Sequence, residues 1–209
     1  MPIHLCKTVF IAGLTLVLAA CGSSPRDDYY LLSAAALPGA TGNSPSLGIG
    51  PVEIPEYLSR EKMVFQRRPN TLDVADSRKW AEPLEDGIKR VLALNLSSLV
   101  NTQDVRFYPW HPKRPPQYGV KVNIMSMDAT PSGASMTAEW LVYRANSEPV
   151  TRKISRLEQA IDGPASGQNI AATYSALLQQ LSELIGAAVA ADAREGNRET
   201  GAAAEEAPG

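Results

Sequence analysis

Few residues in this sequence could carry covalent chemistry or bind a metal ion. The 209 residues include two cysteines, Cys6 and Cys21, and two histidines, His4 and His111. The chain after Cys21 contains no thiol, which excludes disulfides, cysteine-based zinc sites and cysteine nucleophiles from that part. A single histidine in the same part is too few for a histidine metal cluster or a histidine-based triad. The sequence therefore predicts no catalytic residue, no metal site and no cofactor.

Composition and charge restrict the class of protein further. Apolar residues make up 44% of the chain and charged residues 20%, as is typical of a globular domain. The 20 basic and 22 acidic side chains leave a formal net charge of −2. Because no strong basic surface is available to hold phosphates, we expect no nucleic-acid partner.

Cys21 ends a segment that is typical of export signals. Residues 2–8 carry one lysine and no acidic side chain, and residues 9–20 are then apolar or small. This apolar run is too short to cross a bilayer, which takes about 20 residues. A basic start followed by a short apolar run is the pattern of a secretory signal peptide, which we predict over residues 1–20.

The residues around the cysteine make this prediction more specific. Leu18-Ala19-Ala20-Cys21 resembles the lipobox of bacterial lipoproteins, which implies cleavage before Cys21 and acylation of that residue. Each acyl CH₂ in the bilayer contributes about 0.8 kcal/mol, so two or more chains hold a protein on the membrane. Gly22 stands where aspartate usually directs retention in the inner membrane. The resemblance therefore favours a periplasm-facing outer-membrane lipoprotein with residues 21–28 as its lipidated tether. The alternative is a soluble exported protein whose cysteine lies there by chance.

Two segments after the tether have the spacing of amphipathic helices. In the first, residues 82–100, apolar side chains recur every three or four positions. Pro83 fits its first turn, where no backbone N–H is needed. The second helix is predicted over residues 169–191, again with one apolar face. Residues 192–209 lose that face, and we predict a disordered tail there.

Short β-prone runs precede and separate these helices. The predicted strands cover residues 29–32, 47–50, 52–54, 63–67, 71–74, 105–108, 118–127, 136–143 and 150–157. Pro69-Asn70 supplies the turn of a hairpin, and the last three strands form an antiparallel meander. The order of elements predicts a single α+β domain over residues 29–191. We expect a largely antiparallel or mixed β-sheet with two amphipathic helices packed on one face.

Several segments together are similar to the PqiC-type lipoproteins, also named ABC-type transport auxiliary lipoproteins. The similar segments are Tyr29-Tyr30-Leu31-Leu32, residues 50–60 (GPVEIPEYLSR), Trp80-Ala81-Glu82-Pro83-Leu84, Tyr118-x-Val120-x-Val122 and Ala138-x-Trp140. The resemblance implies a non-enzymatic partner of an MCE-domain protein, in a system that moves phospholipid or other apolar molecules between the two membranes. It also implies that copies of the chain can assemble as a homo-oligomeric ring.

Most of the candidate partner-binding residues lie between Pro51 and Arg60. Two prolines remove backbone donors there, so this stretch must bulge or follow a sheet edge. Its Tyr and Leu either pack into the core or form a contact surface for another subunit or the MCE-domain protein. Trp80 is either a hydrophobic staple of the first helix or an interface anchor. Trp110 lies either in a solvated turn or against lipid phosphates or an acidic partner. The candidate partner-binding residues are Pro51, Pro55, Tyr57, Leu58, Arg60, Trp80 and Trp110.

Three functions remain open on the sequence alone. The first is an outer-membrane lipoprotein that is the auxiliary subunit of an MCE-type lipid transport system and maintains envelope integrity. The second is a lipoprotein that itself carries an acyl chain, which requires a cavity between the helices and the sheet. The third is a structural lipoprotein that assists assembly of another outer-membrane complex. The leucine-rich helix faces favour mutual packing over a cavity, so the first function is preferred to the second.

Overall fold

The computed structural model of this chain describes residues 26–205. The predicted signal peptide, residues 1–20, and the acylation site at Cys21 lie outside the described residues. The elements in chain order are β1 (Asp28–Tyr30), β2 (Leu47–Glu53), the short 3₁₀ helix η1 (Glu56–Leu58), β3 (Lys62–Arg68), β4 (Thr71–Trp80), α2 (Leu84–Val100), β5 (Val105–Phe107), β6 (Tyr118–Ala129), β7 (Gly133–Arg144), β8 (Pro149–Ala160) and α3 (Gly167–Glu205). This combination of two helices and a mixed set of strands confirms the predicted α+β fold.

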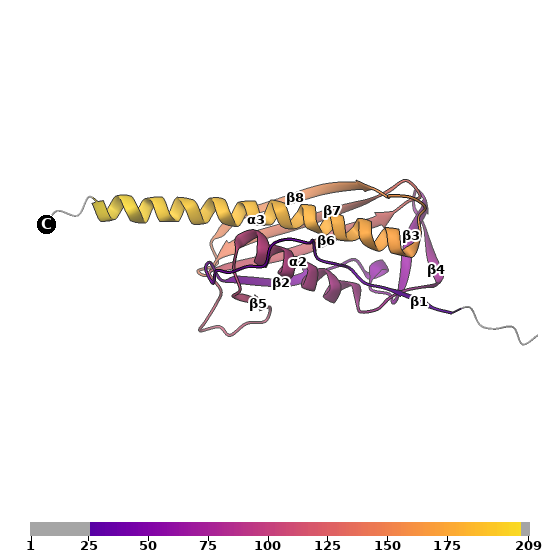
Figure 1. Cartoon of the computed structure of the whole chain (residues 1–209), viewed down its shortest axis with the longest axis horizontal. Coiled ribbons are helices and arrows are strands. Elements are labelled where there is room, and N and C mark those ends of the chain that lie inside the picture. The colour runs from indigo at the N-terminus through magenta and orange to yellow at the C-terminus, as the bar shows by residue number, and fades with distance from the viewer. Residues whose placement is uncertain (1–25, 206–209) are drawn as a thin grey trace, which may run out of the picture.

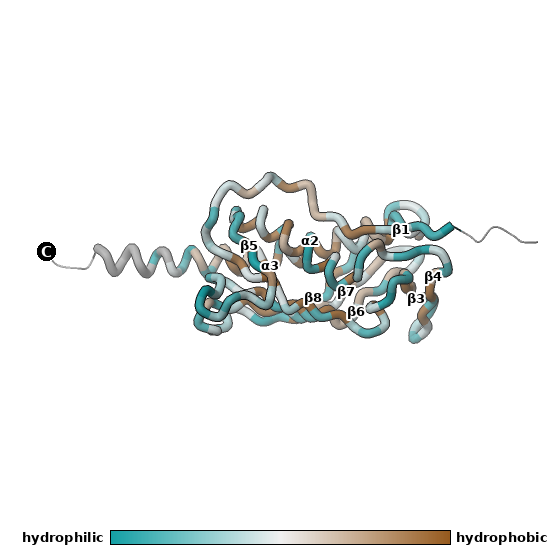
Figure 2. Tube along the Cα trace, turned by 90° about the horizontal axis from the view of Figure 1, so that it is seen from below, coloured by the Kyte–Doolittle hydropathy of each residue, from teal (hydrophilic) through white to brown (hydrophobic). Residues whose placement is uncertain are grey.

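The helices and strands form two layers. Figure 1 shows α2 and α3 on the same side of the large sheet. Figure 2, turned by 90°, shows the two layers from their edge, with α2 and α3 above and strands β6 and β8 below. The large sheet has five strands in the order β5-β2-β6-β7-β8. The predicted meander is confirmed, because β6, β7 and β8 pair antiparallel in sequence order.

Alternation along the meander decides which sheet face is covered. Val120 lies opposite Val142, and Val122 lies opposite Trp140, all with their side chains buried. Residues between them point to the other face and are partly exposed. The Trp140 indole N–H lies on the covered face and donates to the hydroxyl of Ser155 at 3.0 Å, so its one polar group is satisfied.

Both helices bury one stripe of side chains against this sheet face. On α2 the buried apolar residues are Leu84, Ile88, Val91, Leu92, Ala93 and Leu96; on α3 they are Ile170, Ala171, Tyr174, Leu177, Leu178, Leu181, Ile185 and Val189. The spacing of three and four residues is the one that the sequence predicts. Each fully buried Leu, Ile or Val contributes about 1.5–3 kcal/mol relative to exposure. Burial of this stripe is therefore the main force that holds the helices on the sheet.

The strands divide into two sheets where the sequence predicts one. The second sheet has the order β1-β4-β3. Its β3–β4 hairpin is the predicted one, and Asn70 takes the left-handed conformation in the turn, with φ 60°. β1 pairs with β4 in parallel, which brings Tyr30 opposite Trp80. No local pattern in the sequence indicates that two strands so far apart pair in parallel. The sequence therefore gives no reason to separate these strands into a second sheet, and one sheet is expected.

α3 departs from the prediction of a helix that ends at residue 191 before a disordered tail over 192–209. The structure continues the helix to Glu205, for 39 residues in all. Asp192 accepts hydrogen bonds from the Arg144 guanidinium, at 2.7 and 3.0 Å, and from the Tyr118 hydroxyl, at 2.8 Å. These contacts fasten the helix to the meander beyond the predicted boundary. Residues 206–209 lie outside the described residues.

The Asp192 cluster generates a prediction about pH and stability. The Arg144 guanidinium beside it lowers the pKa of Asp192 below its ordinary value. A lowered folded-state pKa stabilises the fold above the ordinary aspartate value near 4, and this stabilisation is lost as the pH falls through the folded-state value. We expect Asp192→Asn to lower the melting temperature at pH 7 by about 2–4 °C, and the difference from the parent to shrink below about pH 4.

Thermal unfolding followed by circular dichroism at pH 7 and at pH 3 measures this effect. Asp162→Asn is the matched control, because Asp162 is exposed and forms no ion pair with the side chains that the structure describes. A loss of stability from Asp192→Asn that is equal at both pH values would show that the charge of Asp192 plays no part.

Candidate functional site

The segment from Gly50 to Arg60 begins with a break in β2. Gly50 has φ +112°, a conformation that favours glycine, and a Cβ there would lie 3.1 Å from the Cβ of Tyr108. Pro51 follows it and has no N–H to give to a neighbouring strand. The pairing of β2 with β6 shifts register between Ile49 and Val52, so the predicted bulge is present at Pro51.

The chain then turns through η1, which begins after Pro55. Leu58 is buried in the core. The Tyr57 hydroxyl accepts a hydrogen bond from the backbone N–H of Met127 and donates one to the carboxylate of Asp128, both at 3.1 Å. Burial is the main reason that the pKa of Tyr57 is raised to about 12. Tyr57 and Leu58 therefore fix this segment to β6 and the core. Of the two alternatives that the sequence offers for them, packing into the core and a contact surface, this arrangement corresponds to the first.

Trp80 is also held inside the domain. Its ring stacks on that of Tyr174 in α3, with 6.2 Å between the ring centroids. Its backbone N–H donates to the carbonyl of Glu61 at 2.7 Å, which joins the end of β4 to the start of β3. Trp80 thus packs against α3, and it shares the core with Leu84 in the first turn of α2, as a staple on that helix would.

The turn after Trp80 is fastened by one arginine. The Arg90 guanidinium on α2 donates to the Glu82 carboxylate, at 2.5 and 3.2 Å, and to the backbone carbonyl of Leu32 at 2.9 Å. Pro83 precedes the first turn of α2, and Glu85 and Asp86 lie in that turn, where the helix dipole favours acidic groups. The start of α2 is thereby set in a fixed position beside η1.

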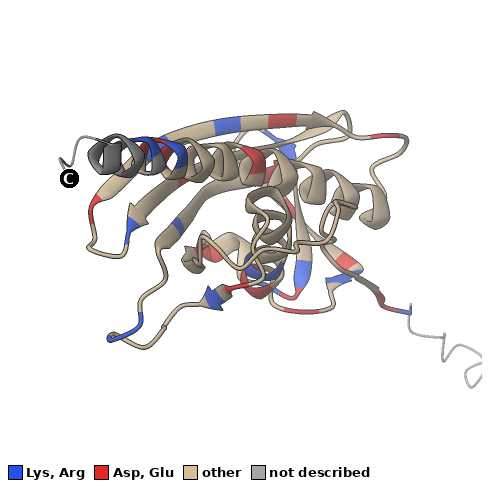
Figure 3. Cartoon of the chain, turned by 60° about the vertical axis from the view of Figure 1, so that its left-hand side comes forward, with Lys and Arg blue, Asp and Glu red and all other residues tan. Residues whose placement is uncertain are grey.

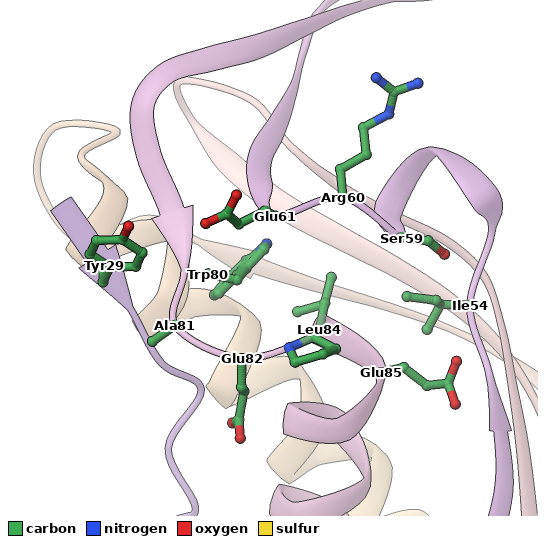
Figure 4. A pocket seen from close by; sticks show the side chains of 11 residues that line it. Tyr29, Ile54, Ser59, Arg60, Glu61, Trp80, Ala81, Glu82, Leu84 and Glu85 are labelled. Atoms are coloured by element: carbon green, nitrogen blue, oxygen red, sulfur yellow. The ribbon is translucent and has the colours of Figure 1, made fainter. Parts of the chain in front are cut away.

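These two turns enclose a surface pocket of about 340 Å³ (Figure 4). The pocket residues are Tyr29, Ile54, Ser59, Arg60, Glu61, Trp80, Ala81, Glu82, Pro83, Leu84 and Glu85. They come from β1 and from residues 50–60 and 80–84, which are similar to the family, together with Glu61 and Glu85 directly after the latter two segments. Segments that are far apart in the sequence therefore meet at one place on the surface.

The chemistry of the pocket suits binding of an apolar side chain. Ile54, Trp80 and Leu84 line it with apolar groups, and charged side chains such as Arg60 and Glu85 stand around it. Figure 4 shows the Arg60 side chain directed outward. Across the described part of the chain, basic and acidic residues are interspersed (Figure 3), and no cluster of three histidine, cysteine or acidic side chains could hold a metal. Among those same residues, no helix is long and apolar enough to cross a membrane.

Trp110 lies apart from this pocket. It follows β5, and Figure 1 shows β5 away from the end of the molecule that holds β1. Its ring packs edge-on against Tyr108, with 5.5 Å between centroids, and covers Gly48, where a Cβ would come within 2.6 Å of the indole. The candidate partner-binding residues therefore do not form one site.

The structure sorts the predicted residues by exposure. Arg60 is exposed, Pro51, Pro55, Tyr57 and Trp110 are partly exposed, and Leu58 and Trp80 are buried. Sequence reasoning omitted Ile54, Glu61, Glu85 and Tyr29 from the candidates, although the similar segments contain or adjoin all four. Only their position in or next to those segments could have identified these four residues, since none of their side chains is of a type that by itself indicates a binding site.

The structure is thus an α+β domain with a small pocket, partly lined by apolar side chains, on its surface. The family model described as ABC-type transport auxiliary lipoprotein component matches residues 29–186. Because that match spans most of the chain, the protein belongs to this family of transport auxiliary components. The resemblance seen in the sequence is thus confirmed.

Solved structures share the fold. One, titled only as the crystal structure of an uncharacterized protein, has a TM-score of 0.66 at 19% identity and covers 78% of this chain and 99% of its own. Protein XCC0632 from Xanthomonas campestris, of family DUF330, has a TM-score of 0.65 at 11% identity and covers 80% of this chain and 99% of its own. A comparison with curated proteins finds no match.

The hydrogen bonds of Tyr57 generate a second prediction. Tyr57→Phe removes the acceptor of the Met127 N–H and the donor to Asp128, and we expect a loss of about 1–2 kcal/mol in the free energy of unfolding. Urea unfolding measures it. Tyr108→Phe is the matched control, since Tyr108 is 52% exposed; an equal effect of the two substitutions would contradict the assigned role of the Tyr57 hydroxyl.

Proposed function

We propose that this protein is a lipoprotein, acylated at Cys21 and anchored in the outer membrane, that is the non-enzymatic auxiliary subunit of an MCE-type lipid transport system. The family match supports a transport auxiliary role. The observation that carries the proposal is the pocket, because it is assembled from the same segments that resemble the family. In this proposal the pocket receives an apolar side chain of the MCE-domain partner.

The position of the pocket supports an adaptor role. Its apolar residues are held from behind by the Trp80–Tyr174 stack and by the Arg90–Glu82 pair, so the site is formed before a partner arrives. Hot spots in protein interfaces typically consist of one anchor side chain that enters a preformed pocket surrounded by polar groups. Arg60 and Glu85 on the rim would then select the orientation of the partner through charge.

The interior offers little support for the acyl-chain carrier. That function needs a cavity between the helices and the sheet. The side chains that face each other across this layer are fully buried, among them Leu92, Leu96, Ile124, Met127 and Met136. Large aliphatic and thioether side chains therefore fill the layer, as in an ordinary packed core.

Acylation is tested by moving the protein off the membrane. We expect Cys21→Ser to shift the protein from the membrane fraction to the soluble periplasmic fraction, because the acyl chains no longer contribute their transfer free energy. Cys6→Ser is the matched control, since residue 6 leaves with the predicted signal peptide. Fractionation with detection by immunoblot measures the distribution and shows from the size of the protein whether the signal peptide has been removed; a cleaved Cys21→Ser protein that stays in the membrane fraction would contradict the anchor.

The partner is tested by photocrosslinking in cells that express the whole transport operon. We expect a photoreactive amino acid at Ser59 or Glu85, on the pocket rim, to capture an MCE-domain protein, at a yield at least about tenfold that from Glu158. Glu158 is exposed on β8 and does not line the pocket, so it reports random contact. Mass spectrometry identifies the captured protein; equal yields from all three positions would sink the proposed site.

A further inference from the structure

We propose that the tip of the β3–β4 hairpin, residues 67–74, rests on an anionic phospholipid surface, in the leaflet that holds the acyl chains. We refer to these residues as the hairpin tip. This inference rests on acylation of Cys21 and goes further, because it states which part of the domain touches the bilayer. Three features of the chain support it: the length of the tether, the direction in which the tether leaves, and the side chains at the tip.

The tether is too short to hold the domain far from the membrane. β1 begins at Asp28, seven residues after Cys21. A fully extended chain spans at most about 3.3–3.6 Å per residue, so the bilayer surface lies within about 25 Å of the start of β1. The end of the domain that carries β1 must therefore face the membrane closely.

The pairing of β1 sets the direction of the tether. β1 runs parallel to β4 and places Asp28 opposite Arg78. The chain therefore enters β1 from the side of Arg78 on which β4 begins, and β4 begins at Thr71 in the hairpin tip. β4 is irregular between Val74 and Lys79, and its partner β3 spans the same length from Arg68 to Lys62, six residues or about 20 Å. The hairpin tip thus lies within the distance from β1 that the tether can span at most.

A single ion pair reinforces this arrangement. Asp27, the residue before β1, lies 3.0 Å from the ammonium of Lys79 on β4. The last residue of the tether before β1 is thereby held against the hairpin. Figure 1 shows β1, β3 and β4 gathered at the same end of the molecule, with the C-terminal end of α3 at the opposite end.

The side chains at the hairpin tip suit a lipid headgroup region. Leu72 is 44% exposed and Val74 is 41% exposed, and their spacing of two residues places both on one face of β4. Arg68 is exposed and pairs with no carboxylate among the side chains described between residues 26 and 198. Arg67 pairs with Asp73 at 2.6 Å, on the surface of the molecule. Apolar groups beside an arginine without a carboxylate partner match a surface of acyl chains and phosphates.

Ile154 provides an exposed apolar position away from the hairpin tip and from β1. Ile154 on β8 is 65% exposed, but it lies on the open face of the large sheet between Arg152 and Arg156, and no tether leads there. It therefore serves as an internal reference for an exposed apolar position on the same domain. The contrast between Leu72 and Ile154 separates membrane contact from exposure alone.

The closing experiment uses the acylated full-length mature protein with one environment-sensitive NBD label. Leu72→Cys, Val74→Cys and Ile154→Cys each provide one free thiol, because Cys21 is blocked by its thioether and Cys6 is removed. Each labelled protein is reconstituted into vesicles of phosphatidylethanolamine and phosphatidylglycerol. We expect a blue shift and at least about a twofold rise in emission at positions 72 and 74 relative to the same label on the Cys21→Ser protein in buffer, with no change at position 154.

The outcomes distinguish this inference from the anchor on which it rests. A protein that floats with vesicles while all three labels emit alike would overturn the hairpin contact and leave acylation intact. A protein that fails to float would overturn both. Arg68→Glu adds a test of charge: we expect it to halve the emission rise at position 72 on phosphatidylglycerol vesicles, and an unchanged rise would overturn recognition of anionic lipid.

Discussion

The inner faces of β2, β6 and β7 carry a continuous apolar surface that must be kept from water, and α2 and α3 together cover it. α2 lies against β2, while α3 lies against β6, β7 and β8, so neither helix covers the whole apolar surface alone. The turn from Trp80 to Leu84 leads into α2, and the segment after β8 leads into α3, so these two connections place the helices on the sheet. The surface pocket exists because the turn from Trp80 to Leu84 brings the start of α2 beside η1.

Local patterns in the sequence predict the long elements correctly. The stripe from Leu84 to Leu96 and the alternation from Tyr118 to Val142 each repeat several times, so the period is read with little ambiguity. The division into two sheets and the full length of α3 depend on contacts between distant residues. Tyr30 opposite Trp80 and Asp192 beside Arg144 are examples, and no local pattern contains either pairing.

The pocket, too, depends on contacts between distant residues that the sequence does not indicate. Resemblance to the family picks out residues 50–60 and 80–84 without indicating that they touch. It also cannot separate Leu58 and Trp80, which support the site from inside, from Ser59 and Arg60, which are exposed at its rim. A tyrosine or tryptophan in such a segment fits both an interface and a core, because burial and partner contact use the same apolar surface.

The place of β2 has a kinetic meaning. Leu47 pairs with Val105 on one side and with Tyr118 on the other, so both neighbours of β2 come from the second half of the chain. A chain that emerges N-terminus first cannot begin its large sheet until those residues are available, and closing such long loops slows folding. Until then Leu47, Ile49 and Val52 stay uncovered on an unpaired strand, which is the stage at which aggregation competes with folding.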